Sequence, residues 1–168
     1  CQSSTFSLCD SLKANVKVKI LTGTLTLQVH EAMYYKTNQL HNTGICKLCD
    51  SGIEDRSHFL LYCPVTEELR RAYKSRLVEL LMVQGYQNLI TSDTTLLQLL
   101  IDLSHDSVPP QIRENLELCF SIEKLSRDWI YFLYMKRLSV LDKNPILRAK
   151  RGAQKSKCAT GRRNPRES

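Results

Sequence analysis

The stretch that decides the fold is residues 46–64, CKLCDSGIEDRSHFLLYCP. Three cysteines and one histidine follow the pattern C-x2-C-x8-H-x4-C in it: Cys46, Cys49, His58 and Cys63. The C-x2-C step lets a tight turn present two sulfurs to one metal ion at about 2.3 Å, and three thiolates with one imidazole complete a tetrahedral zinc site. The spacing therefore predicts one bound zinc ion in a knuckle at residues 46–63, in preference to four ordinary buried side chains.

The four predicted ligands leave no coordination position open, which is typical of structural zinc and not of catalytic zinc. His58 and Cys63 are five residues apart, so a helical turn or a bend must place both on one side. His41 is a weaker alternative ligand. The knuckle has little apolar surface of its own, and its metal affinity would therefore add directly to the folding free energy.

Apolar residues at helical intervals flank the knuckle on its carboxyl-terminal side. Pro64 stands at a preferred first helical position, and an apolar stripe follows over residues 65–81. Ser92 or Asp93 caps a short predicted helix that runs through Leu103. Four basic side chains of the first helix are expected to be solvated, in preference to contacting nucleic acid: Arg70, Arg71, Lys74 and Arg76.

A longer helical pattern covers residues 110–140, either broken near Ser121 or continuous. At this spacing Trp129, Phe132 and their aromatic neighbours are expected in the core, although a binding surface is the alternative. We therefore predict a mainly α fold, with a helical domain over residues 14–147 organised around the single zinc knuckle.

The first thirty residues carry weaker signals. Residues 1–13 are polar and rich in serine, so we expect little order there, and because Cys1 stands in place of Met we expect a fragment or a processed product. Residues 16–27 fit two structures. Alternation of apolar residues and lysines predicts a hairpin, whereas helical spacing predicts two helices separated by Gly23.

The net charge of +7 is concentrated at one end of the chain. Residues 148–168 hold eight of the 24 Lys and Arg residues and one of the 17 Asp and Glu residues, so the rest of the chain is neutral. Such a segment neutralises phosphates but, without aromatic residues, cannot stack bases. We expect a disordered tail that binds RNA or DNA without sequence preference. The expected nucleic-acid-binding residues are Arg148, Lys150, Arg151, Lys155, Lys157, Arg162, Arg163 and Arg166.

Cysteine usage and the basic tail indicate a compartment. Seven cysteines is an odd number, unlike the even counts of short secreted disulfide frameworks, so a reducing compartment is favoured. Basic clusters at residues 150–151 and 162–163 would serve as a nuclear localisation signal. We predict an intracellular, nuclear protein, and since no run of eighteen apolar residues occurs, we expect no membrane partner.

No catalytic centre is visible. The chain has neither a phosphate-binding G-x-x-x-x-G-K-[ST] loop nor a G-x-S-x-G elbow. The adjacent acids at residues 54–55 and 67–68 lack the surroundings of metal-binding catalytic carboxylates. We therefore expect a chain that is not an enzyme.

The knuckle and the segment before it resemble the C-terminal zinc-binding region of LINE-type (non-LTR) retrotransposon polyproteins, downstream of the reverse transcriptase. The matching residues are LTGT at 21–24 with LQ at 27–28, the CKLC at 46–49, EDR at 54–56 and HFLLYCP at 58–64. The resemblance covers roughly residues 14–82. Retroviral knuckles share the H-x4-C half, but their central loop is four residues shorter.

The resemblance implies a mostly helical fold around one zinc knuckle that assists nucleic-acid handling. It also implies upstream polymerase domains as partners, since this chain has no Y-x-D-D motif, and it favours two helices separated by Gly23 over the hairpin. Two alternatives stay open: a zinc-stapled helical module that binds protein, and a degenerate retroelement remnant.

Overall fold

The computed structural model describes residues 8–30 and 44–143, and these residues are mainly helical. Apart from one isolated antiparallel bridge between Ile45 and Ile53, the two described ranges contain no β-structure. The elements in chain order are α1 (Leu8–Leu21), η1 (His58–Tyr62), η2 (Pro64–Thr66), α3 (Glu67–Val83), η3 (Gln87–Thr91), α4 (Asp93–Ile101), α5 (Pro110–Glu114) and α6 (Leu116–Lys143). The predicted mainly α fold is confirmed.

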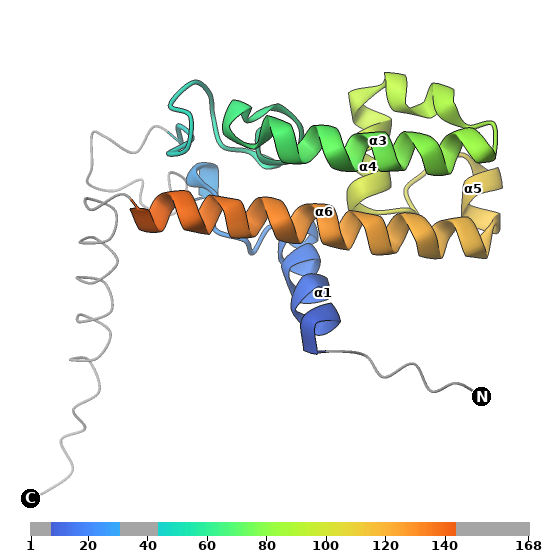
Figure 1. Cartoon of the computed structure of the whole chain (residues 1–168), viewed down its shortest axis with the longest axis horizontal. Helices are drawn as coiled ribbons and strands as arrows, with labels where there is room; N and C mark the ends of the chain where they lie inside the picture. Colours follow the sequence, from blue (N-terminus) through green and yellow to red (C-terminus); the bar gives the residue numbers. More distant parts are fainter. Residues whose placement is uncertain (1–7, 31–43, 144–168) are drawn as a thin grey trace, which may run out of the picture.

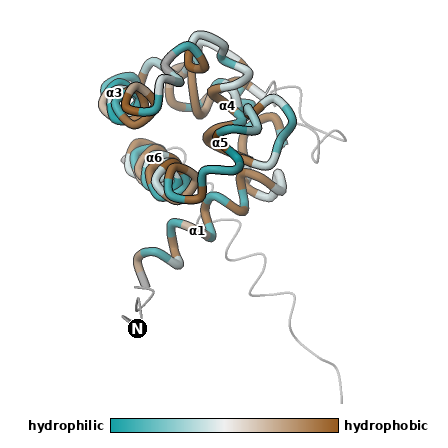
Figure 2. The backbone as a smooth tube through the Cα atoms, turned by 90° about the vertical axis from the view of Figure 1, so that its right-hand side faces the viewer, coloured by the Kyte–Doolittle hydropathy of each residue, from teal (hydrophilic) through white to brown (hydrophobic). Residues whose placement is uncertain are grey.

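The long helix α6 is the axis of the molecule. Helix α3 runs beside it, and α1 crosses it steeply on the opposite side (Figures 1 and 2). Helices α4 and α5 also contact α6. One core fills the space between these helices, and its largest fully buried side chains include Ile20, Leu77, Leu81, Leu96, Leu99, Leu100, Ile112, Ile122 and Trp129.

Helix α1 begins at Leu8, so the expectation of little order over residues 1–13 is wrong for residues 8–13. Tertiary contacts explain the difference, because a polar segment with serines has only a weak tendency to form a helix by itself. The Lys13 ammonium lies 2.7 Å from the Asp128 carboxylate of α6. One turn later Val16 enters the core, and Ile20 follows it. Residues 1–7 lie outside the described residues.

The segment after α1 follows the two-helix prediction and not the hairpin. Helix α1 ends at Leu21, and Gly23 adopts φ 69°, a left-handed conformation that glycine tolerates best. Helical structure resumes at residues 28–30. A change of direction at Gly23 thus separates α1 from the segment that leads toward the knuckle.

The predicted break within residues 110–140 occurs at Asn115 and not near Ser121. Asn115 adopts an extended conformation between α5 and α6, and its side-chain oxygen accepts a hydrogen bond from the Leu118 N–H at 3.1 Å. A side-chain oxygen in this position caps the free N–H groups of a new helix. Ser121 lies inside the first turns of α6 and interrupts nothing.

Other boundaries follow the sequence closely. Pro64 opens the single turn η2, and α3 starts three residues later. Ser92 caps α4 by accepting a bond from the Thr95 N–H at 3.5 Å, as predicted, although α4 ends before Leu103. Among residues 8–30 and 44–143, no helix combines the length and apolar character that crossing a membrane requires.

Candidate metal centre

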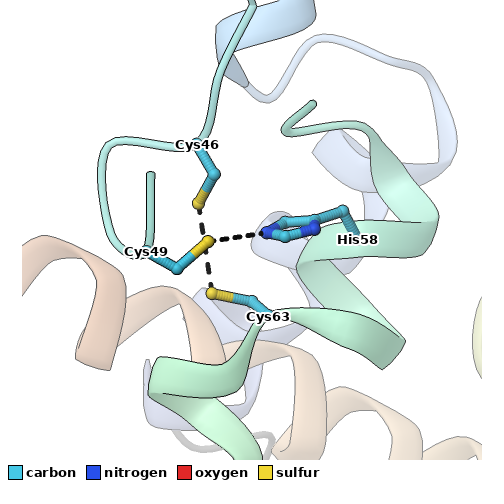
Figure 3. Close-up of side chains that lie close together, drawn as sticks. All are labelled: Cys46, Cys49, His58 and Cys63. Carbon is cyan, nitrogen blue, oxygen red and sulfur yellow. Dashed lines mark hydrogen bonds between the residues drawn. The ribbon is translucent and has the colours of Figure 1, made fainter. Parts of the chain in front are cut away.

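The four predicted ligands converge. The three sulfurs and a ring nitrogen of Cys46, Cys49, Cys63 and His58 all lie within 4.8 Å of one another (Figure 3). The Cys46 and Cys63 sulfurs are 4.0 Å apart, and the Cys49 sulfur is 3.3 Å from His58 Nε2. Donor atoms drawn this close from two separate segments form a site that could hold a metal ion.

The first two cysteines are carried by a short hairpin-like loop. The bridge between Ile45 and Ile53 closes its base, and the Cys46 N–H donates to the Gly52 carbonyl at 2.8 Å. At the tip, the Asp50 N–H donates back to the Cys46 carbonyl at 2.8 Å, and Asp50 adopts φ 53°. This tight turn brings Cys49 back beside Cys46, as the C-x2-C spacing predicts.

The other two ligands are held by η1, a single turn of π-helix. The Cys63 N–H donates to the His58 carbonyl at 2.8 Å, a hydrogen bond between residues five apart. This turn explains the H-x4-C spacing, because it brings Cys63, five residues after His58, back to the side of the chain on which His58 lies. Asp55 caps its start by accepting the His58 N–H at 2.7 Å. Phe59 and Leu60, both fully buried, anchor the turn in the core.

Neighbouring groups act on the thiols. A hydrogen bond from the Cys46 thiol is the main cause that lowers the pKa of Cys63, while burial opposes it. The same hydrogen bond, together with burial, raises the pKa of Cys46. The backbone N–H groups of Leu48 and Cys49 point at the Cys46 sulfur and lower its pKa, which partly offsets those effects. The turn thus supplies donors that stabilise a thiolate.

Arg70 is buried, which corrects the expectation of a solvated side chain. Its guanidinium donates to the carbonyl of Cys63 and, at 2.8 Å, to the Thr66 hydroxyl, and it pairs with the Glu67 carboxylate. Arg70 therefore secures the chain where it leaves the last ligand. The other three basic residues of α3 are exposed, as predicted: Arg71, Lys74 and Arg76.

Glu54 is a second residue that sequence reasoning missed. In the sequence it is only one of two adjacent acids without catalytic surroundings, yet it is 1% exposed and binds the guanidinium of Arg137 through two hydrogen bonds of 2.7 and 2.9 Å. Its position between Ile53 and Asp55 gives no local sign of burial. The partner lies 83 residues away, on α6.

Three further predictions concern the aromatic residues of α6, the alternative ligand His41 and the basic tail. Trp129 is buried and stacks on Tyr73, with 6.2 Å between the ring centres, as expected of a core residue, whereas Phe132 is 41% exposed. His41 lies outside the described residues. So do all eight basic residues of the tail, at residues 148–168.

No family model matches this chain, and neither does any curated protein or solved structure.

Proposed function

We propose that this chain is a zinc-stabilised, nucleic-acid-binding module, equivalent to the C-terminal zinc-binding region of a LINE-type retrotransposon polyprotein. The observation that carries the proposal is the convergence of Cys46, Cys49, His58 and Cys63 on one point. The resemblance of residues 14–82 to that region, described above, adds the biological context.

Zinc is the metal that the donor set favours. Soft thiolates with one imidazole, arranged tetrahedrally, are typical of zinc. Zn–S bonds of about 2.3 Å place the sulfurs of a tetrahedral site about 3.8 Å apart, close to the 4.0 Å between Cys46 and Cys63. Protein ligands would fill all four positions, so the ion would be structural and not catalytic.

The basic tail supports nucleic-acid binding. Helix α6 ends at Lys143, five residues before the tail of residues 148–168 with its eight Lys and Arg residues. In the proposed role these cations contact phosphates, without preference for sequence, while the folded domain holds the tail beside polymerase domains encoded upstream. Each phosphate contact releases counterions, so affinity falls steeply as salt increases.

The first experiment measures bound zinc in protein purified from a reducing host, beside Cys49→Ser and His58→Ala. We expect about one equivalent in the wild type and loss of zinc in both variants. Cys119→Ser is the matched control, because Cys119 lies outside the four-residue cluster and its thiol donates to the Ile112 carbonyl at 3.0 Å. Wild-type protein without zinc would remove the basis of the proposal.

The second experiment measures affinity for single-stranded RNA and DNA against salt concentration, with and without residues 148–168. If the tail makes six to eight phosphate contacts, the slope of log K against log salt should flatten by about 4 to 6 units when it is deleted. Equal slopes for both proteins would exclude the tail from binding.

Individually exposed apolar side chains on α3 and α6 favour a second candidate, a zinc-stapled module that binds protein. A groove of about 550 Å³ lies between the carboxyl-terminal half of α3 and the first half of α6. Val83, at the edge of α3, is 82% exposed, and on α6 Leu116 and Phe120 are exposed by more than 70%. Nucleic-acid affinity that changes neither with zinc removal nor with tail deletion would favour this candidate.

A further inference from the structure

A buried ion pair connects the metal site to α6. Arg137 Nε donates to Glu54 Oε1 at 2.7 Å, and a second guanidinium nitrogen donates to Oε2 at 2.9 Å. Glu54 is 1% exposed and Arg137 is 5% exposed. A bidentate pair of this kind fixes both the distance and the relative orientation of the two segments.

The Glu54 carboxylate joins three parts of the molecule. Besides Arg137, it accepts the backbone N–H of Gln28, where helical structure resumes after α1, at 2.9 Å. Its other oxygen lies 3.9 Å from the Cys46 sulfur. The Glu54 backbone N–H donates to the Gly44 carbonyl, two residues before that ligand. The position of Glu54 and the position of Cys46 are therefore linked through both side chain and backbone.

The charges around Cys46 explain why the guanidinium matters. Three thiolates and Zn²⁺ carry a net charge of about −1, and the Glu54 carboxylate adds a further negative charge 3.9 Å from the Cys46 sulfur. Arg137 neutralises that carboxylate inside the protein, where charges are screened only weakly. Without the guanidinium, the carboxylate would be left buried and unpaired, and the loop that carries Cys46 would lose its fixed position beside α6.

We propose that Glu54 and Arg137 are positioning residues of the metal centre, and that metal binding in turn fixes the carboxyl-terminal end of α6 through them. The inference rests on the zinc ion proposed above. Thermodynamic linkage requires the effect to be reciprocal. If the bound ion strengthens the anchoring of Arg137, removal of Arg137 weakens metal binding by the same factor.

The test compares Arg137→Met with Lys17→Met. Lys17 is the matched control for Arg137, because it is also a buried cation that joins a distant segment to α6. It does so through Glu123 and Ser126. Zinc affinity is measured by competition with a chromophoric chelator, and amide hydrogen exchange is followed over residues 134–143 with and without zinc. A double variant, Glu54→Gln with Arg137→Met, completes the series.

We expect Arg137→Met to weaken zinc binding about 10- to 100-fold. This is the usual effect of removing a residue that supports the surroundings of a metal ligand without itself binding the metal. Lys17→Met should lower stability yet leave zinc affinity within about twofold of wild type. The double variant should recover part of the loss, because it leaves no uncompensated carboxylate beside Cys46. Zinc should slow exchange over residues 134–143 in the wild type and not in Arg137→Met.

Two results would overturn the inference while zinc still binds to the wild type. One is zinc affinity of Arg137→Met within twofold of wild type, and the other is unchanged exchange over residues 134–143 when zinc is added. If Arg137→Met does not fold, Arg137→Gln keeps a polar side chain but loses both the charge and the bidentate geometry, and wild-type zinc affinity in it would count equally against the inference. A wild type that binds no zinc would overturn the proposed function as well.

Discussion

Gly52 determines how closely the knuckle loop approaches His58. A Cβ atom placed on Gly52 would lie 3.2 Å from His58 Nδ1, tighter than most such contacts, whereas one on Gly23 would meet nothing within 4 Å. We therefore expect Gly52→Ala to weaken zinc binding several-fold by displacing the imidazole. Gly23→Ala should cost about 1 kcal/mol of stability through its φ of 69° and leave zinc affinity unchanged. Chelator competition and urea unfolding separate the two effects, and equal zinc affinity in both variants would contradict this view of Gly52.

Arg70 supports the same site from the other side. Arg70→Ala removes the donors to the Cys63 carbonyl and the Thr66 hydroxyl, both in a buried turn. The Cys63 carbonyl keeps the Thr66 N–H and hydroxyl as donors, so the cost is the loss of the bonds from the charged guanidinium. Hydrogen bonds from a charged group contribute about 1.5–3 kcal/mol each, and we therefore expect a stability loss of about 2–4 kcal/mol in urea unfolding with excess zinc. Arg71→Ala, one residue along on an exposed face, should change stability by less than about 0.5 kcal/mol. Similar stability losses for Arg70→Ala and Arg71→Ala would show that the hydrogen bonds of Arg70 to this turn contribute little to stability.

At the scale of the element, the start of α6 depends on a cap that the apolar pattern does not reveal. Asn115→Ala removes the side-chain acceptor of the Leu118 N–H and should cost about 1 kcal/mol of stability. Ser121→Ala, within the helix, should be neutral to within about 0.5 kcal/mol. Thermal unfolding of the two variants distinguishes them, and a larger effect at Ser121 would contradict the observed helix boundary.

The helices and the metal site also show which parts of the structure can be predicted from the sequence. Apolar residues at helical intervals predict α3, α4 and α6, because helices of this length bury one face each, and ligand spacing predicts the metal site. The start of α1 at Leu8 depends on contacts with α6 more than 100 residues later, such as that between Lys13 and Asp128. For the same reason the burial of Glu54 could not be predicted, since its partner on α6 lies 83 residues away.

At the scale of the whole molecule, the metal site and the helical core are joined but distinct. Phe59 and Leu60 of η1 belong to the core, and η1 contacts α3, α4 and α6. The core also contains side chains from α1 and α5 that lie outside the knuckle, such as Ile20 and Ile112. Loss of metal should therefore loosen the knuckle and lower stability, while the helices remain assembled.

Trp129 makes this expectation testable, because it is the only tryptophan of the chain and is 1% exposed. At free zinc a hundredfold above the Kd, the ion contributes about 2.7 kcal/mol, so chelation should lower the Tm by roughly 5–10 °C for a chain of this size. At 25 °C, however, Trp129 emission should stay that of a buried indole after chelation. An emission shift to that of a solvated indole, at 25 °C and without denaturant, would mean that the core forms only around the metal. In that case the helical core would need the metal-bound knuckle in order to fold, and the knuckle would not merely stabilise a core that folds independently.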